Sequence, residues 1–246
     1  MKLPEIAGPS IEKVLEEFLS EQKKRLKPRT VSSYKDVIEL LMDYMNGYAY
    51  QALSEAESAL FDKYYDAKGS EHKEFCQLFG PEKIAEEVGG FLGYFMISKV
   101  MAGADFKRLA GTVVKKLSKW LGEKGYVSEE DVQIAKEEGA AGARDLPRAE
   151  KAGHILYEIA ESVIFDPDEL DETDYYGFDH YTIERIEPGK LWLGILDRKG
   201  KGVTVGPIAV PNEAAELLRE GWDISCAVAR IGGKWRIIEF ANVYPI

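Results

Sequence analysis

Cysteine and histidine are scarce in this chain of 246 residues, which has two cysteines and three histidines. Neither Cys76 nor Cys226 belongs to a ligand set of the kind that structural zinc sites use, and too few cysteines are present for a disulfide framework. We therefore expect no metal site and no cofactor. The same scarcity predicts a reduced compartment, and we expect the protein to be cytoplasmic.

Long hydrophobic runs are also missing. No segment without a charged side chain in the first half of the chain is longer than the one from Val88 to Ser98. It is well short of the ~20 apolar residues that a membrane helix needs. The first residues, Met1–Glu5, contain no apolar core of a signal peptide. We expect no membrane contact.

Positive charge is in deficit, with 32 basic and 43 acidic side chains and a net charge of −11, which argues against a generally basic nucleic-acid binder. The excess acid is concentrated between Glu158 and Asp179, a stretch without Lys or Arg. Asp166, Asp168 and Asp171 there lack the turn glycine and closing glutamate of a calcium loop. We interpret this stretch as an acidic linker that can contact a basic partner. A local basic face elsewhere remains open.

Helical periodicity dominates the first half. Ile11, Val14, Leu15 and Phe18 follow the three-and-four spacing of one helical face. In the fourth predicted helix, three glycines indicate close packing against a neighbour. The predicted helices span residues 10–26, 28–46, 54–66, 82–101, 105–124, 128–138 and 148–163.

The period changes to two in the second half, where β-branched and aromatic residues alternate between turns. Pro188-Gly189 and Gly232-Gly233 predict two of these turns. The order β-β-β-α-β-β suits a small closed barrel, OB-like or SH3-like, because closure removes exposed edges. We thus predict an α+β protein with a helical domain (1–147), a linker helix and acidic linker (148–178) and a barrel (179–246). The predicted strands span residues 180–187, 190–197, 203–210, 224–231 and 234–244, with one helix near 211–221.

No catalytic motif is recognisable. The glycines between Arg198 and Thr204 lack the spacing of a phosphate loop, and no G-x-S-x-G elbow occurs. We expect no catalytic residue and no enzymatic activity.

The segment Leu26–Tyr34, with sequence LKPRTVSSY, resembles the start of the second helix in the N-terminal SAM-like, or core-binding, domain of phage integrases and other tyrosine recombinases. The resemblance covers about residues 8–130 and includes IEKVLEEFL at Ile11–Leu19 and TVVKKLSKWLGEKGYV at Thr112–Val127. It implies a helical bundle that binds duplex DNA. The catalytic domain of the family is absent, since no histidine begins an H-x-x-R element.

The sequence offers two sets of candidate contact residues. A helix N-terminus has free N–H groups, so Lys27, Arg29 and Thr30 are placed to hold a backbone phosphate. Along the helix predicted over 105–124, Arg108, Lys115 and Lys119 recur on one side, which is also typical of a solvated helix face. On the barrel, exposed aromatic and basic residues suit single-stranded nucleic acid or a protein, although core packing is the alternative for the rings. These barrel candidates are Trp192, Arg198, Lys199, Lys201, Trp235 and Arg236.

Two functions remain open from the sequence. The first is a non-catalytic DNA-binding protein whose barrel contacts nucleic acid or protein. The alternative is a scaffold that keeps the helical fold for protein contacts, because fold and function need not coincide.

Overall fold

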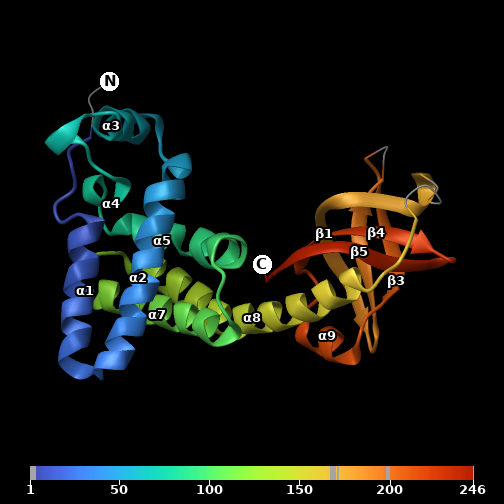
Figure 1. Ribbon diagram of the computed structural model, residues 1–246. Coiled ribbons are helices and arrows are strands. Elements are labelled where there is room, and N and C mark those ends of the chain that lie inside the picture. Colours follow the sequence, from blue (N-terminus) through green and yellow to red (C-terminus); the bar gives the residue numbers. More distant parts are fainter. Residues whose placement is uncertain (1–3, 167–169, 171, 198–199, 246) are drawn as a thin grey trace. The chain divides into compact units, whose positions relative to one another are not determined.

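Figure 1 shows the computed structural model of the chain, which describes residues 4–166, 170, 172–197 and 200–245. The chain divides into two compact units. We call Met1–Phe95 with Leu109–Ala143 the helical unit, and Met96–Arg108 with Arg144–Ile246 the barrel unit. Helices make up the first, and the second contains a five-stranded sheet, as expected for an α+β protein. No helix in the described ranges is long and apolar enough to cross a membrane.

The helical unit begins with two long helices joined by a tight connection, α1 (Ile11–Arg25) and α2 (Pro28–Tyr48). The apolar stripe predicted for α1 is confirmed, because Ile11, Val14, Leu15 and Phe18 are all fully buried. Pro28 occupies the first turn of α2, where its missing N–H costs no hydrogen bond. The remaining helices of this unit are α3 (Glu55–Tyr65), α4 (Phe75–Leu78), α5 (Glu82–Gly90), the 3-10 turns η1 (Ala49–Ala52) and η2 (Gly69–Glu71), and parts of α7 (Ala104–Glu123) and α8 (Glu129–Glu161).

The helix predicted over 82–101 is present over 82–98, but it is not regularly α-helical. Helix α5 ends at Gly90, a π-helical segment follows over Phe91–Phe95, and α6 (Met96–Ser98) is a single turn. The physical reason lies in the glycines, which lower helix propensity and allow a close approach. A Cβ at Gly90 would lie 2.0 Å from the Tyr44 hydroxyl, whereas Gly93 faces open space. The expected close packing is therefore found at Gly90 and not at Gly93.

The two helices predicted over 128–138 and 148–163 form one continuous helix, α8, of 33 residues. Pro147 lies inside it and removes one backbone donor, which normally favours a break. Burial on both sides of Pro147 overrides this local preference, since Leu146 and Ala149 are both buried. The division between the two compact units falls between Ala143 and Arg144. In a regular helix the carbonyl of Ala143 would accept a hydrogen bond from the N–H of residue 147, and Pro147 has no N–H to donate.

Within the helical unit, α7 and α8 approach each other at glycines. A Cβ at Gly111 would lie 2.1 Å from the backbone nitrogen of Ala143, and one at Gly139 would lie 2.6 Å from the backbone nitrogen of Lys115. Side chains at these positions would hold the helix backbones apart. The two glycines therefore determine how α7 lies in the unit.

Five strands form the sheet of the barrel unit, in the predicted order with a helix between the third and fourth. They pair as β1-β2-β3-β5-β4, and β4 pairs with β1 to close the sheet. Both predicted turns are confirmed as two-residue turns: Glu187 pairs with Lys190, and Ile231 pairs with Lys234. At the second, both Gly232 and Gly233 have positive φ, which explains the glycine pair. The elements are β1 (Tyr175–Glu187), β2 (Lys190–Leu196), β3 (Gly202–Ala209), α9 (Asn212–Leu217), β4 (Asp223–Ile231) and β5 (Lys234–Tyr244).

The core of the barrel unit combines the inner face of the sheet with the second part of α8. Along β2, Leu191, Leu193 and Ile195 point inward and are buried, while Trp192 between them is half-buried. Ala152 and Leu156 of α8 belong to the same core. The first strand starts at Tyr175, about five residues before its predicted start, so part of the predicted acidic linker is strand.

Candidate nucleic-acid interfaces

The connection between α1 and α2 carries a cluster of basic side chains that we call the basic corner: Lys23, Lys24, Lys27 and Arg29. All four are exposed. The first turn of α2 contains no acidic residue, and the last turn of α1 ends in three basic ones. The sequence-predicted Lys27, Arg29 and Thr30 therefore lie together at the exposed N-terminus of a 21-residue helix, where free N–H groups favour an anion.

Sequence reasoning missed Lys23 and Lys24 of this corner. The signal was present, since Gln22–Lys35 contains six basic residues and no acidic one in a chain of net charge −11. Arg25, between them and Lys27, is held by two hydrogen bonds to the Gln22 side chain, at 3.0 and 2.7 Å. It points its guanidinium along α1 and is less available to a ligand.

The end of α7 and the residues after it contact two acidic residues of α1 beside the basic corner. Trp120 donates a hydrogen bond to Glu21 at 2.7 Å, and Lys124 donates to Glu21 at 2.5 Å and to Glu17 at 3.0 Å. The pKa of Glu17 is lowered mainly by the hydrogen bond from Tyr126 and next by the one from Lys124. The pKa of Glu21 is lowered mainly by the hydrogen bond from Lys124 and next by the one from Trp120. These two acids of α1 are thus held by Trp120 of α7 and by Lys124 and Tyr126 after it, and Lys124 offsets one of their two negative charges.

Tyr34 is a core residue and connects α2 with α7. Its ring is buried, and its hydroxyl accepts a hydrogen bond from Lys116 at 2.6 Å. The ammonium of Lys116 also lies 5.3 Å from the centre of the Tyr34 ring. Lys116 therefore adds a cation beside the second turn of α2, which the sequence did not single out.

The basic residues predicted along α7 differ in their surroundings. Lys115 is exposed and, within the described ranges, has no ion-pair partner. Lys119 pairs with Glu123 at 3.3 Å, four residues later on the same helix. Arg108 belongs to the barrel unit and pairs with Asp105 at 2.8 Å. We therefore keep Lys115 and Lys119 in the helical-unit interface and leave Arg108 out of it.

A second basic surface lies on the barrel, in a groove of about 480 Å³. Four cationic side chains line it, Lys190, Arg230, Lys234 and Arg236, and no acidic side chain does. Its floor includes Trp235, whose half-buried ring packs on Tyr176 with 5.7 Å between ring centres. Arg230 forms an ion pair with Asp174 at 3.8 Å. We call this surface the barrel groove.

The barrel candidates from the sequence separate into three groups. Trp235 and Arg236 line the barrel groove. Trp192 lies outside it on β2, beside Gly206 and below Arg185, whose guanidinium is 4.6 Å from the ring centre. Lys201 is exposed but does not line the groove. Arg198 and Lys199 lie outside the described residues.

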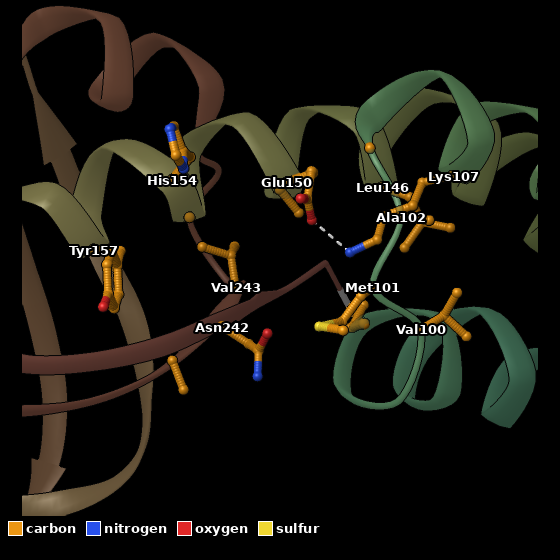
Figure 2. A pocket seen from close by; sticks show the side chains of 15 residues that line it. Val100, Met101, Ala102, Lys107, Leu146, Glu150, His154, Tyr157, Asn242 and Val243 are labelled. Carbon is orange, nitrogen blue, oxygen red and sulfur yellow. Dashed lines mark hydrogen bonds and ion pairs between the residues drawn. The ribbon is translucent and has the colours of Figure 1, made fainter.

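The barrel unit also contains a cavity of about 430 Å³, drawn in Figure 2. Val100 and Met101 reach it from the loop before α7, His154 and Tyr157 from α8, and Asn242 from β5. In its wall, the ammonium of Lys107 lies 2.5 Å from the Glu150 carboxylate. The side chain of Lys107 is only 6% exposed. Because this lysine is already neutralised, the cavity offers no strong anion site.

Neither cysteine lines the barrel groove or belongs to the basic corner. Burial raises the pKa of both cysteine thiols, Cys76 and Cys226, so they remain protonated at neutral pH. Among the residues that the structure describes, no three His, Cys, Asp or Glu side chains are grouped as metal ligands are. Comparisons with protein families, with curated proteins and with solved structures find no match to this chain.

Proposed function

We propose that this protein binds nucleic acid without catalysing a reaction on it, and that the basic corner contacts duplex DNA. One observation carries the proposal. Four exposed Lys and Arg side chains surround the start of α2, while Glu17 and Glu21 of α1 are already paired with Lys124. The resemblance of Leu26–Tyr34 to integrase core-binding domains supports the same surface.

In this proposal the corner holds the DNA backbone and does not read bases. A phosphate at the N-terminus of α2 accepts hydrogen bonds from free backbone N–H groups and from the Thr30 hydroxyl, with Lys27 and Arg29 as counter-charges. Such interactions fix register and orientation but carry no sequence information. Binding is therefore expected to be strongly dependent on salt.

The finer fold assignments belong to the same proposal. We propose a SAM-like bundle for the helical unit, on the strength of the sequence resemblance. For the barrel, the closed order β1-β2-β3-β5-β4 and the position of α9 support the OB-like alternative over the SH3-like one.

Replacing both Lys27 and Arg29 with alanine is expected to weaken binding to duplexes of any sequence. The slope of log affinity against log salt should fall by about 1.8, or about 0.9 for each phosphate that the variant no longer neutralises. Fluorescence anisotropy of labelled duplexes with the full chain, from low to physiological salt, measures both. The control carries the same charge change at two exposed lysines of the helical unit outside the corner, Lys63→Ala with Lys68→Ala. An unchanged slope in the corner variant would contradict the proposed surface.

The barrel groove supports a second interaction, with single-stranded nucleic acid. Its four cations suit phosphates, and the half-buried Trp235 suits base stacking. Replacing Lys234 with alanine should lower the salt slope for an oligothymidine by about 0.7 and leave duplex binding unchanged. Lys201→Ala removes one exposed lysine of the same barrel outside the groove, and serves as the control. Equal effects of the two substitutions would argue against the groove.

Absence of binding to both kinds of DNA at low salt would favour the scaffold alternative. Its test is capture of a basic partner that is lost when Asp166 and Asp174 become asparagine. Asp168 and Asp171 of the predicted acidic linker lie outside the described residues.

A further inference from the structure

A third cavity, of about 420 Å³, lies within the helical unit and is lined by aromatic rings and one carboxylate. Helix α2 contributes Tyr44 and Tyr48, α5 contributes Glu87 and Gly90, and the π-helical segment contributes Tyr94. No Lys or Arg lines it. We call it the tyrosine pocket. It is separate from the basic corner and from the barrel groove, so its ligand is independent of the proposed function.

The three tyrosine rings present π faces and edges to one another around the pocket. Tyr44 and Tyr48 stack with 5.8 Å between ring centres and 11° between ring planes. Tyr48 and Tyr94 meet edge to face at 6.3 Å and 66°. Tyr44 is buried, Tyr48 is half-buried and Tyr94 is exposed, so the aromatic lining extends from the interior to the mouth. The negative face of an aromatic ring attracts cations.

Glu87 is the unusual member of this set. It is only 9% exposed and, among the described residues, it has no ion pair. One carboxylate oxygen accepts a hydrogen bond from the Tyr44 hydroxyl at 2.7 Å. Burial, followed by that hydrogen bond, raises the pKa of Tyr44, so the phenol keeps its proton and continues to donate. A buried carboxylate without a counter-ion is costly, and a bound cation would remove that cost.

Local backbone features place these groups together. A Cβ at Gly90 would lie 2.0 Å from the Tyr44 hydroxyl, so only glycine lets Tyr44 reach Glu87 as it does. The π-helical segment begins at the next residue and shifts Tyr94 from the position that a regular helix would give it. Single π-helical turns within helices are frequent at functional sites. The pocket therefore rests on two local departures from regular helix.

We propose that the tyrosine pocket binds an organic ammonium cation, with the positive group against the tyrosine rings that line the pocket and its charge balanced by Glu87. An alkylated ammonium fits because it is bulky and weakly hydrated, and aromatic pockets recognise such groups through cation–π interactions. A metal ion such as Ca²⁺ fits poorly, since it takes six or more oxygen ligands, commonly several carboxylates, and the side chains that line the pocket supply one carboxylate, the Gln51 amide and phenol groups. The cation belongs either to a free small molecule or to an alkylated lysine side chain of a protein.

Isothermal titration calorimetry of the full chain tests the charge requirement. The probes are choline and its uncharged isostere 3,3-dimethylbutan-1-ol. Choline should bind at least tenfold more tightly. Glu87→Gln keeps an acceptor for the Tyr44 hydroxyl but removes the charge, and should weaken choline binding at least tenfold without changing the isostere. Glu82→Gln, an exposed position on the same helix, should change neither.

Variants of the rings keep the test independent of folding defects. Tyr48→Leu should weaken choline binding at least fivefold. Tyr48→Phe keeps the π face and should bind choline about as tightly as the unaltered protein. A peptide with one trimethyllysine, compared with its unmethylated form and with choline, distinguishes the sources: tighter binding of the trimethyl peptide indicates a protein side chain, and tighter binding of choline indicates a free small molecule. If neither choline nor the trimethyllysine peptide bound at concentrations up to about 10 mM, the proposal would be overturned, because even a millimolar site would be detected. Equal affinity of Glu87→Gln and the unaltered protein for choline would overturn it as well.

Discussion

Replacing Gly111 with alanine is expected to lower the free energy of unfolding of the helical unit by about 2–3 kcal/mol, within the range that overpacking costs. The new Cβ would lie 2.1 Å from the backbone nitrogen of Ala143 and 2.7 Å from the carbonyl oxygen of Gly139. Both are backbone atoms of α8 and cannot rotate away as a side chain can. The helices would have to separate, which would disrupt the close packing around Gly111.

The matched control is the same substitution at Gly47, near the end of α2. A Cβ there meets nothing within 4 Å, so Gly47→Ala should be neutral or stabilise by up to about 1 kcal/mol through the lower entropy of the unfolded chain. Urea unfolding followed by far-UV circular dichroism compares the two variants. If Gly111→Ala were as stable as the unaltered protein, α7 and α8 would not approach as closely as the structure shows.

Replacing Phe18 with alanine should have the largest effect on stability, about 3–5 kcal/mol. Its ring is fully buried in the helical unit, where it stacks on Tyr34 with 6.4 Å between ring centres and meets Trp120 edge to face at 5.4 Å. Removing it leaves a cavity among α1, α2 and α7, the helices that position the basic corner. Folded proteins are stable by only about 5–15 kcal/mol, so a loss of this size removes much of the free energy of unfolding. Duplex binding by the basic corner should therefore be lost as Phe18→Ala unfolds.

Phe178→Ala removes the same atoms at an exposed position on β1 and should change stability by less than about 0.5 kcal/mol. Hydrogen exchange of the backbone amides shows which unit responds. Faster exchange in the barrel strands than in α1 and α2 of Phe18→Ala would contradict the assignment of Phe18 to the core of the helical unit.

Periodicity was sufficient to predict α1, α2 and the strands. A stripe such as Ile11, Val14, Leu15 and Phe18 is a local property, because residues three and four apart share a face in any helix. The Gly232-Gly233 turn is local for the same reason, since its positive φ angles depend on those two residues. Pro147 shows where local rules fail: a proline inside a helix favours a break, and burial on both sides of it overrides that preference in α8.

The candidate interfaces show the same division. Lys27, Arg29 and Thr30 could be predicted because a helix N-terminus and its charges are adjacent in sequence. The pairing of Glu21 with Lys124 could not, since 103 residues separate them. Likewise, Trp192 and Trp235 both alternate outward along strands, but only the sheet register brings Trp235 beside Arg230 and Lys190.

The sequence by itself determined the α+β class, most helices and strands, the charge balance and the basic run at the start of α2, because each depends on neighbours along the chain. Only the tertiary structure decided which charges are neutralised and where a carboxylate is buried without a counter-ion. In the sequence, Glu87 is one of several glutamates on an amphipathic helix. The hydrogen bond with Tyr44, 43 residues away, and the close approach at Gly90 make it part of a pocket, because burial and electrostatic pairing depend on neighbours in space.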